Sequence, residues 1–208
     1  MPWPMVHFAI ASEIVSQHAS PSLLLGSLAP DSIHVRTNVR SEKAKTHLMA
    51  EEHVFPTDVD FQHVIESNRI RMLQETSYLQ YICGYIAHIY TDREWTYQIY
   101  PAYEAHPNEK EVYTHDVKKL EFRILREYAG ASAWLEQLSL AKAYDFGGLK
   151  EQEIYQYRGE KLDFFTNDKN EPDDDMHLLT MDAVSAFIER TASDLKSRFQ
   201  EWHVYEKL

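Results

Sequence analysis

The chain contains few of the residues that cross-link or interrupt a fold. Cys83 is the only cysteine among 208 residues, so no internal disulfide can form, and this composition suits a reducing compartment. Six glycines and eight prolines are few for a β-rich fold that is dense in turns. Their scarcity favours helices.

Long apolar runs are also missing. No stretch of 18 apolar residues occurs, so we expect no transmembrane helix. The first residues, Met-Pro-Trp-Pro-Met-Val-His, lack the basic segment of an export signal, and His7 and Glu13 interrupt their apolar stretch. We therefore expect a cytoplasmic protein.

Positive charge is scarce too. The 21 lysines and arginines are outnumbered by 33 aspartates and glutamates, which gives a net charge of −12, and no dense Lys/Arg run occurs. General nucleic-acid binding is therefore not expected. The charge does not exclude a small phosphate ester held by metal ions, because the ions supply local positive charge.

What the chain does contain is helical periodicity. Apolar residues recur with a period near 3.6 and predict helices over residues 4–19, 60–95 with an interruption near Thr76, 114–128, 132 onward and 180–202. The second half of the 60–95 pattern is apolar nearly all round, which is typical of a central helix. We therefore expect a single-domain all-α bundle over residues 1–208.

Two segments depart from this helical pattern. Residues 31–58 are polar and predict a long irregular connection, a kind of segment that is usually functional or mobile. Residues 155–165 alternate loosely about Arg158-Gly159 and indicate a short β-hairpin.

The most informative pair is His88 and Asp92. In a helix they lie one turn apart on the same face, within a stretch of apolar and aromatic residues. Such a buried pair is either a hydrogen-bonded contact that orders the helix or part of a divalent metal site. The spacing alone leaves both interpretations open.

Three other residues favour the interpretation as a metal site. His7 lies early in an apolar helix, Asp31 directly follows the apolar segment that ends at Pro30, and His47 follows Thr46. Imidazole and carboxylate suit zinc and other borderline divalent ions, and helix bundles collect such ligands one or two per element.

This ordered set resembles the zinc-dependent phospholipase C family, which includes the single-strand-specific zinc nucleases. The resemblance covers about the first half of the chain, and its motifs are Trp3, His7, Leu25-Gly-Ser-Leu-Ala-Pro-Asp31, Thr46-His47 and Gly84-Tyr-Ile-Ala-His88-Ile-Tyr-Thr-Asp92. It implies an all-α phosphoester hydrolase with clustered metals.

The resemblance also implies roles for these residues. Asp31, His47 and His88 would hold one ion, and His7 and Asp92 a second, with Asp92 as the bridge. Asp31, His88 and Asp92 would be the catalytic residues, with Asp31 doubling as general base. Two ions would activate a water and stabilise phosphoryl charge. Zinc is the expected metal, with manganese or iron as alternatives.

The chain also departs from the family. Family enzymes begin with a tryptophan whose free amine binds metal, whereas Trp3 here follows Met1-Pro2. Gln98 stands ten residues after His88, where the family has a further His, and the segment Glu111-Val-Tyr-Thr-His115 has the spacing of the family's His-x-x-x-Glu pair in reversed order. His115 is therefore only a candidate for a third metal site, and a dinuclear site is the alternative.

The expected substrate is a small soluble phosphate ester. Arg36 and Arg40, which follow Asp31 along the chain, are candidate phosphate contacts. Two other functions stay open, a non-enzymatic helical metal-binding module and a nuclease.

Overall fold

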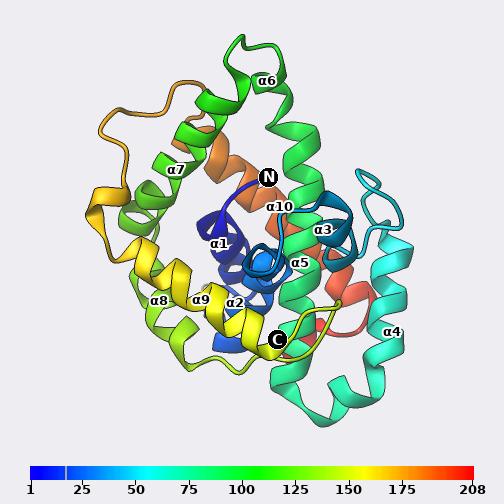
Figure 1. Ribbon diagram of the computed structural model, residues 1–208. Helices are drawn as coiled ribbons and strands as arrows, with labels where there is room; N and C mark the ends of the chain where they lie inside the picture. The colour runs from blue at the N-terminus through cyan, green and yellow to red at the C-terminus, as the bar shows by residue number, and fades with distance from the viewer. Residues whose placement is uncertain (17) are drawn as a thin grey trace.

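Helices account for nearly all the regular structure of the protein. The computed structural model describes residues 1–16 and 18–208 (Figure 1). Within these ranges no strand occurs, which confirms the all-α prediction, and one isolated antiparallel bridge joins Phe146 and Leu149. The α-helices are α1 (Pro4–Ile14), α2 (Pro21–Leu28), α3 (Arg40–Thr46), α4 (Asp58–Gln74), α5 (Thr76–Gln98), α6 (Pro101–Glu104), α7 (Glu109–Glu127), α8 (Ala131–Leu140), α9 (Glu151–Phe165) and α10 (Met181–Glu201). The 3-10 helices are η1 (Ala29–Val35), η2 (Asp168–Asn170) and η3 (Tyr205–Lys207).

Side-chain caps begin several of these helices. The Ser20 hydroxyl accepts a hydrogen bond from the Leu23 amide at the start of α2. Thr57 and Asp60 form a reciprocal capping box at the start of α4, and Thr180 caps α10. Each cap satisfies an amide that the first helical turn leaves unpaired.

Most helix predictions agree with the structure. The 60–95 pattern divides into α4 and α5 at Glu75, whose extended backbone separates the two helices next to the predicted interruption. The first helix ends at Ile14, before the predicted end at residue 19, because the chain turns at Ser16 with a φ of 56°. Gln17, which also fell within that prediction, lies outside the described residues.

The predicted hairpin over 155–165 is wrong, because this segment lies within α9. The Glu153 carboxylate accepts a hydrogen bond from the Lys150 amide at the start of this helix, which begins at Glu151. Ile154, Tyr157 and Phe165 then follow helical spacing and are buried. The loose alternation about Gly159 was the weaker of two periodicities in the same residues.

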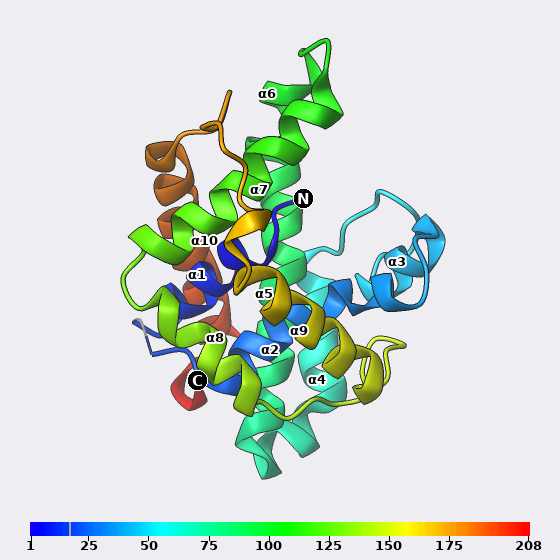
Figure 2. The same ribbon diagram turned by 60° about the vertical axis from the view of Figure 1, so that its left-hand side comes forward.

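The irregular connection predicted over 31–58 is partly helical. Its first residues continue from α2 as η1, and α3 occupies its middle. The stretch from Leu48 to Thr57 carries no helix or strand. Figure 2 shows α3 projecting from the side of the helical body.

The close crossing of α2 and α5 is the centre of the fold. A Cβ on Gly26 would lie 2.1 Å from the Tyr81 carbonyl oxygen, and one on Gly84 would lie 2.2 Å from the Leu23 carbonyl oxygen. Only glycine permits this approach of two backbones.

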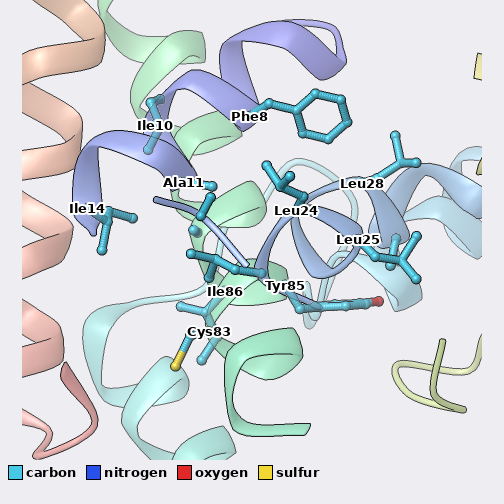
Figure 3. Packing of buried hydrophobic residues seen from close by; sticks show 14 of the residues in the cluster. Phe8, Ile10, Ala11, Ile14, Leu24, Leu25, Leu28, Cys83, Tyr85 and Ile86 are labelled. Atoms are coloured by element: carbon cyan, nitrogen blue, oxygen red, sulfur yellow. The ribbon is translucent and has the colours of Figure 1, made fainter. Parts of the chain in front are cut away.

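One continuous apolar cluster surrounds this crossing. Figure 1 shows α5 running through the molecule with α1 and α2 beside it, while α10 packs on α1 and α4 on α5. In Figure 3, side chains of α1, α2 and α5 face one another, among them Phe8, Leu24 and Ile86. None of the helices in the described ranges has the length and hydropathy to cross a membrane.

Candidate metal centre

Four elements bring the five predicted ligands to one point inside the protein. His7 comes from α1, Asp31 from η1, His47 from the end of α3, and His88 and Asp92 from α5. Ligand atoms of His7, His88 and Asp92 lie within 4.8 Å of one another, and so do those of Asp31, His47 and His88. His88 belongs to both groups, so the two form one continuous centre.

The Asp92 carboxylate lies between the histidines. Its Oδ1 is 3.6 Å from His7 Nε2, and its Oδ2 is 3.3 Å from His47 Nε2 and 3.5 Å from His88 Nε2. Asp31 Oδ1 is 3.4 Å from His47 Nε2. All four distances exceed the usual length of a hydrogen bond to nitrogen, about 2.7–3.2 Å.

Most polar atoms at this centre have no hydrogen-bond partner among the residues described. These atoms are both ring nitrogens of His7, Nε2 of His47 and of His88, and both carboxylate oxygens of Asp92. Buried polar side-chain atoms are normally paired, so six unpaired atoms in one cluster require a physical explanation.

Metal coordination accounts for these separations. Two ligands held about 2.0–2.1 Å from one tetrahedral ion lie about 3.3–3.4 Å from each other. The measured contacts, 3.3 to 3.6 Å, fall at or just above that value. The buried histidines and aspartates could therefore hold divalent metal ions.

Hydrogen bonds from the surrounding backbone orient two of the rings. His88 Nδ1 donates to the Ser27 carbonyl at 2.8 Å, and His47 Nδ1 donates to the Lys43 carbonyl at 3.0 Å. A carbonyl can only accept, so both rings carry a proton on Nδ1 and turn Nε2 toward the centre. Ser27 reaches His88 because Gly84 lets α2 approach α5.

Lys43 gives the centre a positive charge that the sequence analysis did not identify. Its ammonium lies 2.7 Å from Asp31 Oδ1. Burial disfavours the carboxylate charge, but Lys43 and the neighbouring His47 outweigh this and hold the pKa of Asp31 well below its usual range. The sequence feature that could have pointed to Lys43 is its position one helical turn before His47.

The surroundings keep the Asp92 carboxyl ionised and the His7 ring neutral. Burial disfavours the charge of Asp92, but the surrounding His88, His47 and His7 outweigh it and lower the pKa of the carboxyl group. Burial, followed by the nearby His88, lowers the pKa of His7 to about 3, so its ring is neutral at pH 7. Carboxylate and neutral imidazole are the forms that bind a metal.

A cavity of about 370 Å³ lies beside the centre. Lys43 lines it and contacts the centre through Asp31. The cavity wall combines charged side chains with aromatic and apolar ones, namely Met1, Arg40, Lys43, Ala44, Met49, Glu52, His53, Phe55, Thr96, Tyr100 and Tyr113.

The two arginines named as phosphate contacts lie in different places. Arg40 lines this cavity, whereas Arg36 Nε pairs with Glu153 at 3.3 Å and its Nη2 donates to the Gly148 carbonyl at 3.4 Å. Arg36 is therefore engaged with the chain near the start of α9, and only Arg40 is positioned at the cavity.

His115 does not join the five buried residues. It lies on α7 with Asp116 and His177, and the ligand atoms of these three lie within 4.8 Å of one another. Trp3 sits at the start of α1, where its ring packs edge-on against Phe164.

Comparison of the chain with models of protein families, with curated proteins and with solved structures found no significant match. The resemblance drawn from the ordered motifs therefore has no support beyond those residues. What the structure establishes is an all-helical protein with buried His/Asp groups that could hold metal.

Proposed function

We propose that this protein is a metal-dependent phosphoester hydrolase whose buried centre holds two divalent ions. The observation that carries the proposal is the set of six unpaired polar atoms on His7, His47, His88 and Asp92, separated as ligands of common ions are. A site built only for stability would pair these atoms with one another at hydrogen-bonding distance.

In the proposed site, Asp31, His47 and His88 hold one ion, and His7 and Asp92 hold the other. Asp92 serves both, because its two oxygens face different histidines. Three imidazoles and two carboxylates suit zinc best, and manganese or iron next. When bound, the ions lower the pKa of a coordinated water and offset charge on the phosphoryl oxygens.

The chain's own residues would position the substrate. Arg40 and Lys43 line the cavity one turn apart on α3 and offer cationic contacts to a phosphate group. Phe55, Tyr100 and Tyr113 offer apolar area to the organic part of the ester. The low pKa of Asp31 makes it a weak base, so we propose it as a ligand, not as the general base.

The test begins with metal content. Protein purified without chelator is expected to carry about two equivalents of a zinc-class metal by mass spectrometry. His88→Ala should lose metal and lower the hydrolysis of bis(p-nitrophenyl) phosphate at least about 100-fold, because His88 belongs to both ligand groups. His63→Ala, an exposed histidine on α4, is the matched control and should behave as the wild type.

Two outcomes would contradict the proposal. The first is less than half an equivalent of metal, with no uptake when zinc or manganese is added. The second is unchanged hydrolysis in His88→Ala, which would remove that residue from the reaction.

A structural metal site is the second candidate function, and the burial of the centre favours it. The side chains of His7, His47, His88 and Asp92 are each at most 2% exposed, and Asp31 is the most open of the five at 16%. In this case the five ligands would surround a single ion and leave it no position for water. Chelator would then unfold the protein, and a panel of phosphate mono- and diesters would not be hydrolysed.

A further inference from the structure

A second His/Asp cluster lies apart from the buried centre, at the junction of α7 with the segment that precedes α10. His115 and Asp116 lie on α7, and His177 lies in the loop before α10. His115 Nδ1 is 3.4 Å from Asp116 Oδ1, and the two imidazole rings have centroids 4.5 Å apart with planes tilted by 42°. His177 is exposed and His115 is half-buried, so the cluster is open to solvent.

The backbone holds this cluster in place. Asp116 Oδ2 accepts hydrogen bonds from the Tyr103 hydroxyl and from the amides of Leu178 and Leu179. Asp116 Oδ1 accepts one, from the His177 amide at 2.7 Å, and His115 Nδ1 lies 3.4 Å from the same oxygen. Oδ2 is fully occupied. The remaining acceptor site of Oδ1 is available to a cation when His115 carries its ring proton on Nε2.

The same hydrogen bonds fix the position of His177. The His177 amide donates to Asp116, so the backbone of His177 is held beside α7 and its ring lies against that of His115. The two imidazoles and the carboxylate oxygen are therefore brought together by backbone contacts that need no metal. Such pre-organisation lowers the entropic cost of binding an ion.

The charge of the neighbouring loop favours a cation. Asp173, Asp174 and Asp175 precede His177 within four residues and are exposed. Lys119 is occupied elsewhere, since its ammonium pairs with Glu171 at 2.9 Å. Lys110 and Lys118 line a surface hollow together with His115 and are the cations that share it.

We infer that His115, Asp116 and His177 form a second metal site, which takes a zinc-class divalent ion and clamps the segment before α10 to α7. Two imidazoles and one carboxylate suit zinc, cobalt or nickel, and water fills the remaining positions at this open surface. The site is independent of the buried centre and of any hydrolytic activity there.

The test compares metal stoichiometry in single variants of the full chain. Chelator-treated protein is dialysed against zinc, and bound metal is counted by mass spectrometry. Wild type is expected to bind one equivalent more than His115→Ala or His177→Ala, while the control His63→Ala binds as much as wild type. Alanine at 177 keeps the backbone amide that Asp116 accepts, and far-UV circular dichroism checks that each variant is folded.

Cobalt separates this site from the buried centre. The absorption of Co²⁺ bound at the surface site should persist in His88→Ala and disappear in the combined variant His88→Ala/His177→Ala. Zinc should also slow amide hydrogen exchange over residues 171–180 in wild type but not in His177→Ala.

Equal zinc stoichiometry in wild type, His115→Ala and His177→Ala would overturn the site. An extra equivalent of zinc that leaves exchange over residues 171–180 unchanged would overturn the clamp. Both results are independent of whether the buried centre binds metal, because only the difference between matched proteins is read.

Discussion

Asp92 and Asp116 are both fully buried carboxylates, but their surroundings are opposite. Asp116 accepts four hydrogen bonds, from Tyr103 and from three successive backbone amides. Asp92 accepts no hydrogen bond from any residue that the structure describes, and imidazole nitrogens surround it at 3.3 to 3.6 Å. The difference shows that burial alone does not indicate function. The number of donors supplied by the chain separates a carboxylate that the fold itself holds ionised from one that lacks partners within the chain.

Glu121 lies between these two cases. It is fully buried on α7, and both its oxygens share one donor, the Met5 amide at 3.1 and 3.2 Å, at the start of α1. Burial, only partly offset by this hydrogen bond and by Lys161, raises the pKa of Glu121 to about 8. A single neutral donor is thus too little to keep a buried carboxylate ionised at pH 7.

The largest expected effect follows from this pKa. Between about pH 4.5 and pH 8 the folded protein keeps the Glu121 proton that the unfolded chain loses, so the free energy of unfolding falls as pH rises through this window. The contribution is fully present below about pH 4.5, and the loss by pH 8 is on the order of 5 kcal/mol. Urea unfolding at several pH values measures it.

Glu121→Gln should remove this component of the pH dependence, because the amide does not titrate. Glu111→Gln, an exposed position on the same helix, is the control and should keep the wild-type slope. A Glu121→Gln profile parallel to that of wild type would show that Glu121 is ionised throughout the window.

The second effect compares the two aspartates directly. Asp116→Asn should lower the free energy of unfolding by about 3 kcal/mol, since the nitrogen that replaces one carboxylate oxygen cannot accept from the backbone donors of that oxygen. Asp92→Asn in chelator-treated protein should change it by less than about 1 kcal/mol, or raise it, since no donor is left unpaired. Thermal and urea unfolding measure both.

Bound metal should reverse the order of these two stability losses. With zinc present, Asp92→Asn should lose the metal-dependent gain in melting temperature that wild type shows, because binding stabilises only the folded state. Equal losses of stability for the two variants in chelator would mean that hydrogen bonds within the chain hold Asp92 as they hold Asp116.

The smallest expected effect concerns the crossing of α2 and α5, which orients the His88 ring. Gly84→Ala should lower the free energy of unfolding by about 2 kcal/mol, because the added methyl meets the Leu23 carbonyl and α2 must shift. The shift should also move Ser27 away from His88 Nδ1 and weaken metal binding.

Gly159→Ala is the matched control for Gly84→Ala. It is also helical, but an added methyl there meets nothing within 4 Å. It should raise the free energy of unfolding by about 0.5–1 kcal/mol, because alanine loses less backbone entropy in a helix. A similar gain in Gly84→Ala would show that the crossing tolerates a side chain.

Sequence patterns predicted much of the fold. The all-α class, the division of α4 from α5 and the last helix follow from periodicity and caps that act within a few residues. The hairpin prediction failed at Gly159, because local alternation there did not reveal that Ile154 and Tyr157 share a buried helical face.

The candidate site was predictable in its ligand types but not in its supporting contacts. His7, Asp31, His47, His88 and Asp92 could be named from residue type and order. Lys43 and the Ser27 carbonyl could not, because the first depends on how α3 packs on η1 and the second on how α2 meets α5. His115 was a candidate for the main centre, and the structure places it with Asp116 and His177.

The sequence by itself determined that this chain is helical, acidic and equipped with an ordered set of imidazole and carboxylate groups, because those properties reside in residue type and short-range spacing. Only the tertiary structure decided which buried carboxylates are satisfied by the chain. Three of the four hydrogen-bond donors to Asp116 come from residues 61 to 63 positions away, and two of the three histidines around Asp92 come from other elements, α1 and the end of α3. Such partners are set by how helices pack, and local sequence does not encode that packing in a readable form.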